Sequence, residues 1–180
     1  LIEELKKAKV LAFDTETDSL DFTQANLVGL SVATDEDNAY YIPVGHDYEG
    51  APKQLDRDEV LKKLKPIIEK TPLIGQHLKF DRNVLANYDI HLNAIENDTM
   101  LMSYVYDPTA TRHNLDAMAS HYLNVKTTTF EDVAGKGVKQ LTFNQIPLEK
   151  ASDYAAEDAD ITFRCYSHLK PALAKTPSLE

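Results

Sequence analysis

Two acidic residues, Asp14 and Glu16, stand two positions apart where an apolar run gives way to polar sequence. The run at residues 10–13 predicts a buried strand, and the period of two places both acids on the same face of it. Like charges this close repel each other unless a cation lies between them. The pair is therefore a candidate cation site, although on its own the pattern fits the solvated end of a strand better.

Two further acids fall on the apolar faces of predicted helices. At about 100° per residue, Asp158 lies on the stripe formed by positions 151, 154, 155, 161 and 162, and Tyr154 stands one turn before it. Asp81 shares the stripe of positions 78, 84, 85 and 88. Burying an unpaired carboxylate costs on the order of several kcal/mol or shifts its pKa strongly. A hydrogen-bonding partner, such as an arginine or a helix cap, would satisfy Asp158 as well as a cation would.

A shared counter-charge would account for all four inward carboxylates. The chain holds a single cysteine, Cys165, and no clustered histidines, which argues against a zinc cluster. Oxygen ligands without sulfur favour Mg²⁺ or Mn²⁺. Two such cations held about 4 Å apart by acidic residues are the usual arrangement for phosphodiester hydrolysis. The residue types therefore predict a metal-dependent site for that reaction.

The elements that would position these acids predict a mixed α/β fold. Strands are expected at residues 10–16, 27–33, 39–44, 72–75 and 92–95. Helices are expected at residues 56–70, 77–88, 98–106, 114–123 and 148–173, with a loop-rich stretch at 126–147. Asp56 is the expected N-cap of the first helix, and Pro66 lies inside it. Three antiparallel strands followed by alternating strands and helices indicate a mixed sheet covered by helices.

Length and composition exclude several classes of protein. With 180 residues, 43% hydrophobic and 27% charged, the chain suits one globular domain. No apolar run approaches the roughly 20 residues of a membrane span, so no membrane partner is expected. The net charge of −10 argues against gripping duplex DNA over many phosphates, but not against binding one nucleic-acid end at a metal site. The lone cysteine fits a cytoplasmic protein, and the missing initial Met suggests a piece of a longer chain.

Three segments carry a resemblance to a known family. Residues 13–17 (Phe-Asp-Thr-Glu-Thr), 78–82 (Leu-Lys-Phe-Asp-Arg) and 154–158 (Tyr-Ala-Ala-Glu-Asp) resemble the exonuclease motifs of the DEDD superfamily. Residues 14–20, 25–31 and 141–146 extend the similarity to the proofreading 3′→5′ exonuclease domains of the bacterial DNA polymerase I family. The resemblance implies a ribonuclease H-like fold over residues 1–180 and a polymerase domain elsewhere in the parent chain. It also implies release of 5′-mononucleotides from a single-stranded DNA 3′ end.

The resemblance further implies roles for the acids and the tyrosine. Asp14 would bridge two divalent metals, Mg²⁺ or Mn²⁺, with Zn²⁺ as an alternative at one of them. Glu16 and Asp158 would complete the metal site on the nucleophile's side, and Asp81 would hold the second metal through water. Tyr154 and Glu16 would orient the attacking water, whose pKa the metal would lower towards neutrality.

Contacts with the DNA strand are implied in the same way. Leu20 matches an apolar side chain that wedges between the last bases, and Gln76, Arg112 and Phe130 match positions that contact the frayed strand. Stacking of bases on Leu and Phe is tolerant of sequence, as a proofreading site requires.

The sequence departs from the family pattern at two positions. His77 stands where we expect Asn, and Phe80 where we expect Tyr. His77 precedes Asp81 by one turn, so it is expected to touch the terminal nucleotide or to influence the second metal. The metal ligands themselves are intact.

Other interpretations remain open at this point. An RNA-processing exonuclease of the ribonuclease D type would share the four acids and the tyrosine, and tolerance of a 2′-OH would identify it. A catalytically silent module that only binds DNA ends would release no nucleotide in the presence of metal. Helicase-associated exonucleases are further relatives, but the longer matches favour the polymerase family.

Overall fold

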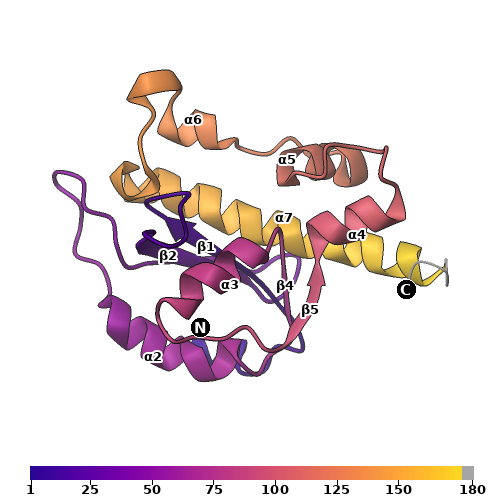
Figure 1. The fold of residues 1–180 in the computed structure, drawn as a ribbon, viewed down its shortest axis with the longest axis horizontal. Helices are drawn as coiled ribbons and strands as arrows, with labels where there is room; N and C mark the ends of the chain where they lie inside the picture. Colours follow the sequence, from indigo (N-terminus) through magenta and orange to yellow (C-terminus); the bar gives the residue numbers. More distant parts are fainter. Residues whose placement is uncertain (176–180) are drawn as a thin grey trace.

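A five-stranded mixed sheet lies between helices in the computed structural model, which describes residues 1–175 (Figure 1). The strand order is β3-β2-β1-β4-β5. β1 (Leu11–Thr17), β2 (Leu27–Ala33) and β3 (Ala39–Pro43) form an antiparallel meander. β4 (Leu73–Gly75) pairs in parallel with β1, and β5 (Ile95–Asp98) in parallel with β4. β1 is therefore the central strand, and its acidic end lies in the middle of the sheet.

Helices cover both faces of this sheet. The shorter ones are α1 (Ile2–Leu5), α2 (Arg57–Ile68), α3 (Lys79–Ala86), α4 (Thr99–Tyr106), α5 (Leu115–Met118) and α6 (Phe130–Ala134). α7 (Leu148–Ala174) crosses the sheet, with α5 and α6 on its outer side, while α2 lies beyond the opposite face (Figure 1). Wider π-helical turns at Ala119–Leu123 continue α5, and 3₁₀ turns lie at Gly137–Lys139 and Phe143–Gln145.

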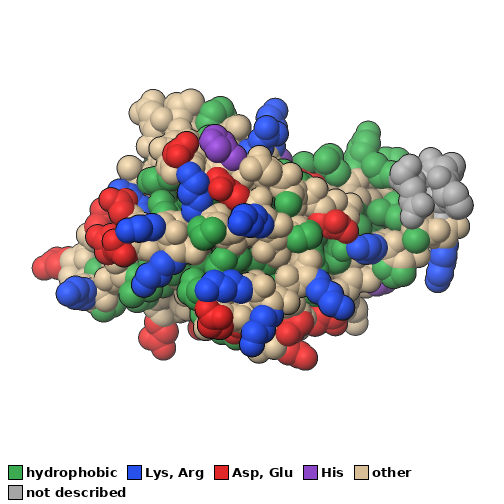
Figure 2. All heavy atoms as spheres, turned by 90° about the horizontal axis from the view of Figure 1, so that it is seen from below, with side chains coloured by type: hydrophobic (Ala, Val, Ile, Leu, Met, Phe, Trp, Pro, Cys, Tyr) green, Lys and Arg blue, Asp and Glu red, His purple; other side chains and the backbone are tan. Residues whose placement is uncertain are grey.

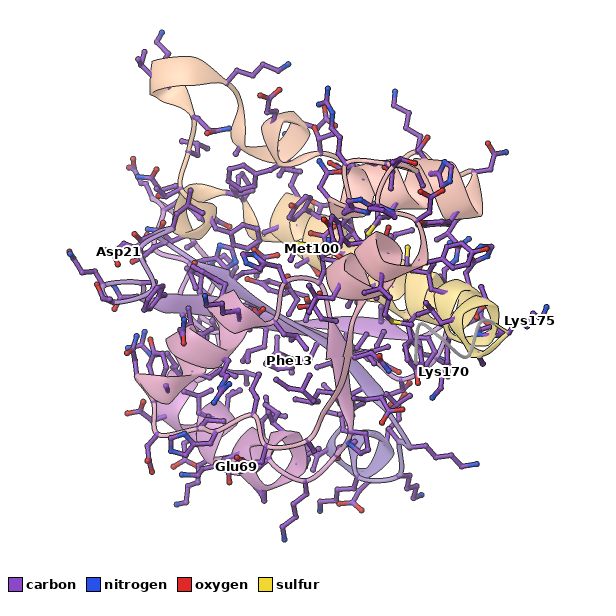
Figure 3. All side chains as sticks on the ribbon, turned by 45° about the vertical axis from the view of Figure 1, so that its right-hand side comes forward. Phe13, Asp21, Glu69, Met100, Lys170 and Lys175 are labelled. Atoms are coloured by element: carbon purple, nitrogen blue, oxygen red, sulfur yellow. The ribbon has the colours of Figure 1, made fainter. Side chains whose placement is uncertain are left out.

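The alternation of side chains along β1 explains the two cores. Leu11 and Phe13 point into a core shared with α2 and α3. Ala12 points to the other face, where it packs with Ile74 of β4 and with Ala159 of α7. Phe13 lies near the centre of the molecule, whereas Asp21, in the loop that follows β1, lies at its edge (Figure 3). Because both faces of the sheet are covered, a carboxylate on β1 lies in a partly buried environment.

Most of the predicted elements are confirmed, and the differences have physical causes. Asp56 caps α2 by accepting a hydrogen bond from Glu59 N at 3.0 Å, and the helix continues through Pro66. The last strand was expected at residues 92–95 but runs over Ile95–Asp98, because Leu92 is buried in the core below the sheet and pairing begins only at Ile95. An edge strand carries polar residues that hide it from a hydrophobicity pattern.

The first strand is confirmed, and one further boundary was wrong. β1 runs through the acidic residues to Thr17, because β2 pairs with it along its acidic end. The helix expected at residues 77–88 is the shorter α3, since His77 has a positive φ of 61° that no α-helix contains. The stretch 126–147 is loop-rich as predicted, and it also contains the short helix α6, which begins with a capping box formed by Thr129 and Asp132.

Charges of both signs are mixed on the face below the sheet. Figure 2 shows Lys and Arg side chains there interspersed with Asp and Glu, and no continuous basic stripe on this face. Such a surface lacks the clustered positive charge that binding along a duplex requires. Within residues 1–175, no helix is both long and apolar enough to cross a membrane.

Close packing at Gly75 makes a testable prediction about α3. A Cβ on Gly75 would lie 2.3 Å from Leu78 Cδ2 and 2.9 Å from Phe13 O. Gly75→Ala should therefore displace the start of α3 and lower the free energy of unfolding by about 1–3 kcal/mol, measured by urea denaturation. Lys63→Ala is the control, because Lys63 is an exposed residue of α2. An equal loss in the two variants would contradict the packing argument.

Candidate active site

Three carboxylates from two elements meet at one point. Asp14 and Glu16 of β1 and Asp158 of α7 each offer an oxygen, and these oxygens all lie within 4.8 Å of one another. All three side chains are partly buried. Three oxygen donors at this spacing form a site that could hold a divalent cation.

The sheet register and the crossing of α7 create this meeting point. Asp14 and Glu16 share a face of β1, and their cross-strand partners on β2 are Ser31 and Gly29, both small. Small partners leave space above the strand, and α7 lies across that face and brings Asp158 down to it. Asp158 therefore points towards the sheet, as its place on the apolar stripe of the helix predicts.

A fourth carboxylate, Asp81, reaches the site from α3. Its Oδ1 accepts hydrogen bonds from Thr15 N at 2.8 Å and from Thr15 Oγ1 at 2.6 Å. β4 pairs with β1 only at Leu11 and Ala12, so further along β1 the Thr15 N–H has no strand partner on that side, and Asp81 takes the partner's place. Asp81 also lies near Asp14, and the negative charge of Asp81 raises the pKa of Asp14. Asp81 is only 2% exposed.

Burial raises the pKa of all four carboxyl groups. At Asp14 the charges of Asp81, Glu16 and Asp158 add to the effect of burial, and at Glu16 those of Asp158 and Asp81 do so. Burial outweighs the hydrogen bonds from Thr15 and raises the pKa of Asp81 to about 6. It also outweighs the opposite effect of Tyr154 and raises the pKa of Asp158 to about 7. Without a cation, the cluster therefore retains protons at neutral pH.

Tyr154 stands beside this cluster, one turn before Asp158 on α7. Its hydroxyl lies near enough to the Asp158 carboxyl group to favour the ionised form of that group. Burial, and then the negative charges of Asp158, Glu16 and Asp14, raise the pKa of Tyr154 well above its usual value. The phenol therefore stays protonated and acts as a hydrogen-bond donor in the site.

An open groove next to the carboxylates contains two of the predicted strand-contacting residues. Residues 17–21, Phe130 and residues 140–143 line it. Leu20 is 93% exposed there, which is unusual for a leucine and means that it contributes little to the core. Phe130 is partly buried, and its ring lies 6.2 Å from that of Tyr154, edge to face. Two residues of the groove, Phe130 and Phe143, thus have rings next to the tyrosine of the site.

The other predicted contacts lie on the far side of β1, after β4. Both ends of the Gln76 amide are bonded within the chain: Nε2 donates to His113 O at 2.8 Å, and Oε1 accepts from Thr99 Oγ1 at 2.6 Å. Arg112, next to His113, is exposed. Gln76 therefore connects the end of β4 to the segment that presents Arg112.

His77 is exposed, and Asp98 fixes its backbone. Asp98 Oδ1 accepts from His77 N at 3.1 Å, and Oδ2 accepts from Leu78 N at 2.8 Å. Oδ1 also accepts from Met100 N, so one carboxylate caps α4 and holds the turn before α3. Phe80, the second departure from the family pattern, is partly buried against the core below the sheet.

Sequence reasoning missed Thr15 and Asp98, because their partners are distant in sequence. Glu157, which the helical stripe places away from the core, accepts a hydrogen bond from Thr128 N at 2.8 Å and fastens the segment before α6. Of these residues, only Asp98 has a local sequence signal, because an acid directly before a helix is typical of an N-cap.

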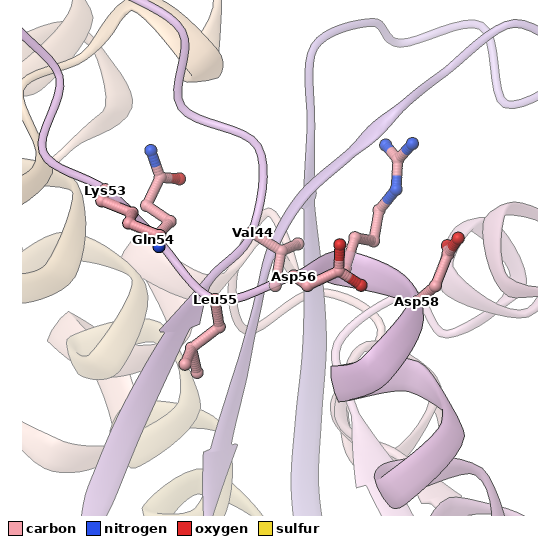
Figure 4. A pocket seen from close by; sticks show the side chains of 7 residues that line it. Val44, Lys53, Gln54, Leu55, Asp56 and Asp58 are labelled. Atoms are coloured by element: carbon pink, nitrogen blue, oxygen red, sulfur yellow. The ribbon is translucent and has the colours of Figure 1, made fainter.

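A second depression lies at the start of α2 and shares no residue with the carboxylate site (Figure 4). It is lined by Val44 and residues 53–58. Two of its acids, Asp56 and Asp58, belong to the first turn of α2, where they stabilise the helix N-terminus. Its acids thus have a structural explanation.

Comparison with known proteins gives a consistent result. A family model described as 3′-5′ exonuclease matches residues 1–174. DNA polymerase I of Pseudomonas aeruginosa is 53% identical over 182 aligned positions, which cover 99% of this chain and 20% of that protein. The chain thus spans about a fifth of the length of the DNA polymerase I relatives that it matches.

Solved structures with a similar fold share little sequence identity with this chain. Brucella melitensis NrnC with bound Mg²⁺ has a TM-score of 0.65 at 20% identity, covering 97% of this chain and 79% of that chain. The catalytic core of RRP6 from Trypanosoma brucei has a TM-score of 0.71 at 15% identity, covering 99% of this chain and 45% of that chain. The ribonuclease H-like fold that the sequence predicts is confirmed.

Proposed function

Since the chain belongs to the 3′-5′ exonuclease family, we propose that it hydrolyses the terminal phosphodiester bond at single-stranded or frayed DNA 3′ ends and releases 5′-mononucleotides. Membership makes the chain an exonuclease, a hydrolase, in agreement with the resemblance noted in the sequence. The proposal concerns the substrate, the two metals and the residues that act. We also propose that residues 1–180 are one exonuclease domain within a longer polymerase chain.

The observation that carries the proposal is the meeting of Asp14, Glu16 and Asp158 within 4.8 Å, with Asp81 near Asp14. Burial and mutual repulsion raise the pKa values of these acids, so keeping them ionised costs folding free energy unless a bound cation compensates. Ordinary folding would place small or apolar residues at these positions. Binding of cations explains why four carboxylates stand there instead.

The donor set fits Mg²⁺ or Mn²⁺. It consists of carboxylate oxygens with no sulfur ligand, and Cys165 is buried away from it, in the core between the sheet and α7. Asp14, Glu16 and Asp158 would hold one ion, and Asp14 with Asp81 the other. When bound, the two ions supply Lewis-acid stabilisation of the charge on the phosphate and a lowered pKa of the attacking water.

The chain's own residues orient the reactants. The Tyr154 hydroxyl and the Glu16 carboxylate would fix the position of a water molecule beside the scissile phosphate. In the reaction an oxygen of this water bonds to phosphorus while the bond from phosphorus to the 3′ oxygen breaks. The products are a 5′-mononucleotide and a strand shortened by one residue with a free 3′-OH.

The groove at Leu20 and Phe130 favours an unpaired strand end. Apolar and aromatic side chains stack on any base, so they can hold a separated strand without reading its sequence. The net charge of −10 and the mixed charges of Figure 2 offer little for a duplex. Matched duplex ends should therefore be cut more slowly than mismatched ends.

The test is incubation with a 5′-labelled single-stranded DNA, with Mg²⁺, with Mn²⁺ and with EDTA. We expect a ladder of strands shortened from the 3′ end, with 5′-mononucleotides as product, and no cleavage in EDTA. An RNA oligonucleotide of the same sequence distinguishes a ribonuclease D-like enzyme, which would cut it as fast. A preparation of Asp14→Asn controls for contaminating nuclease. Metal-independent release, or none at all, would overturn the proposal.

Leu20 provides a prediction about substrate binding. Leu20→Ala should raise KM for single-stranded DNA about tenfold, because one stacking contact is worth about 1–3 kcal/mol. The melting temperature should not change, since the side chain is 93% exposed. Leu55→Ala, an exposed leucine at the depression of Figure 4, is the control and should leave KM unchanged. Equal KM values in the two variants would show that Leu20 is not a strand contact.

A further inference from the structure

A chain of three aromatic rings runs behind the carboxylates from β3 to α7. Tyr41 of β3 lies 6.2 Å from Phe143 between ring centroids at an interplanar angle of 72°, and Phe143 lies 6.1 Å from Tyr154 at 49°. Such tilted and edge-on arrangements are favourable for aromatic rings. Phe143 is only 2% exposed, so it forms a buried wall against which the Tyr154 ring rests.

The Tyr41 ring reaches this position by crossing β2 at Gly29. A Cβ on Gly29 would lie 2.2 Å from Tyr41 Cε2 and from its hydroxyl oxygen. Gly29 is the cross-strand partner of Glu16, so the ring extends towards the carboxylate site. Burial, and then the charge of Glu16, raise the pKa of Tyr41. A glycine inside a buried strand is thus explained by the close approach of this ring.

His46 holds the hydroxyl end of Tyr41. A hydrogen bond of 2.7 Å joins Tyr41 Oη to His46 Nε2. His46 is 5% exposed, and its ring lies 5.7 Å from that of Phe143. Burial lowers the pKa of His46, so the imidazole is neutral at pH 7, and its tautomer decides which partner donates the hydrogen bond between Nε2 and the phenol.

Gln54 fixes the backbone of His46. The Gln54 Oε1 accepts from His46 N, and Nε2 donates to His46 O, both at 2.7 Å. In Figure 4 the Gln54 side chain points away from Asp56 and Asp58, which leaves it free for this pairing. A buried histidine with its main chain bonded on both sides has little freedom to move.

The residues after His46 hold the start of α7. Asp47 N donates to Asn144 O at 3.1 Å, and Asn144 Nδ2 donates to Asp47 Oδ1 at 2.7 Å. Leu148 N, in the first turn of α7, donates to Tyr48 Oη at 3.0 Å. The segment from His46 to Tyr48 therefore fastens both sides of the turn that presents Phe143.

We infer that His46, through Tyr41 and Phe143, is a positioning residue that holds the Tyr154 side chain in place beside Asp158. The inference rests on the proposed function, because it takes Tyr154 to orient the attacking water. His46 itself does not contact the substrate. A misplacement of about 1 Å can cost a reaction about a hundredfold, so the effect belongs in kcat and not in KM.

Kinetic measurements on three variants test the role. His46→Leu keeps the bulk but removes the bond to Tyr41, and we expect kcat on single-stranded DNA to fall about tenfold with KM unchanged. His46→Gln offers an amide to Tyr41 and should restore kcat to within about threefold. Tyr88→Phe is the control, because it removes a tyrosine hydroxyl that bonds Leu27 N in the opposite core and should leave kcat unchanged.

A double-mutant cycle separates positioning from general loss of stability. In a Tyr154→Phe background, His46→Leu should lower kcat no further, because the group that His46 positions is already gone. If the two losses multiply, His46 does not act through Tyr154 and the inference is wrong. It is equally wrong if His46→Leu lowers only the melting temperature.

Tyrosine ring NMR gives a readout that does not depend on activity. The Tyr154 signals are assigned by their absence in Tyr154→Phe. His46→Leu should shift or broaden them, whereas Tyr88→Phe should not. Unchanged Tyr154 signals in His46→Leu would overturn the inference even in an active enzyme. If His46→Leu shifts the Tyr154 signals but the wild-type protein cuts no DNA, the proposed function is refuted and the structural coupling between His46 and Tyr154 stands.

Discussion

Asp158→Asn should reduce the rate of nucleotide release by about a thousandfold without destabilising the metal-free protein. The loss of activity follows from two contacts. The Asp158 carboxylate is one of three whose oxygens lie within 4.8 Å of one another and could hold a cation, and Tyr154 stands one turn before it on α7. An amide keeps the shape but offers a single neutral oxygen, so it weakens the cation site and the orientation of Tyr154 together.

The expected effect on stability has the opposite sign to that of most core substitutions. Burial raises the pKa of Asp158 to about 7, which means that folding at pH 8 leaves its carboxylate ionised in an unfavourable environment. Asn carries no charge, so the cost disappears. The free energy of unfolding in EDTA should therefore equal that of the wild type or exceed it, by up to a few kcal/mol.

Two assays on the same preparations check this prediction. One follows release of nucleotides with Mn²⁺, and the other follows urea denaturation in EDTA. Asp153→Asn is the matched control, because Asp153 is an exposed acid on the same helix. A clear loss of stability in Asp158→Asn would identify Asp158 as a structural hydrogen-bonding residue. Normal activity in a normally folded Asp158→Asn variant would show that Asp158 is not needed for the reaction.

The sequence predicts the carboxylate site well because each acid is placed by a local rule. The period of two along β1 puts Asp14 and Glu16 on one face, and the helical period turns Asp158 and Asp81 inward. These directions need no knowledge of the rest of the fold. Their convergence does need it, since only the crossing of α7 over the sheet brings Asp158 to β1.

Interactions that depend on where an element stops are not predictable in this way. Asp81 bonds Thr15 only because β4 is three residues long and leaves that part of β1 unpaired. Similarly, Tyr41 and His46 stand in ordinary strand and loop sequence, and their relation to Tyr154 passes through Phe143, about a hundred positions later in the chain. The one local sign is Gly29, a glycine within an apolar strand.

The stability of the metal-free protein should fall as pH rises from about 5 to 8. For Asp14, Glu16, Asp81 and Asp158, the folded pKa lies above the unfolded value of about 4. Between about pH 4 and pH 7 the folded state therefore binds more protons than the unfolded state. By linkage, the free energy of unfolding decreases with pH through this window, and we expect a loss on the order of a few kcal/mol.

Divalent cations should reverse this trend. Mg²⁺ or Mn²⁺ binds the deprotonated carboxylates of the folded state, so millimolar metal adds most stability where those groups are ionised. Urea denaturation at pH 5 and pH 8, in EDTA and in Mn²⁺, gives the four values needed. The metal increment should be larger at pH 8 than at pH 5.

A variant that removes two of the charges separates the contribution of the buried cluster to the pH dependence from that of the remaining acids. In Asp14→Asn/Asp158→Asn, the decline between pH 5 and pH 8 in EDTA should flatten, and the increment from metal should nearly vanish. Surface acids such as Asp21 and Asp35 have a pKa lowered by hydrogen bonds, so they act at lower pH and with the opposite sign. If the double variant keeps the wild-type decline, the pH dependence arises from the net charge of −10 and not from the buried carboxylates.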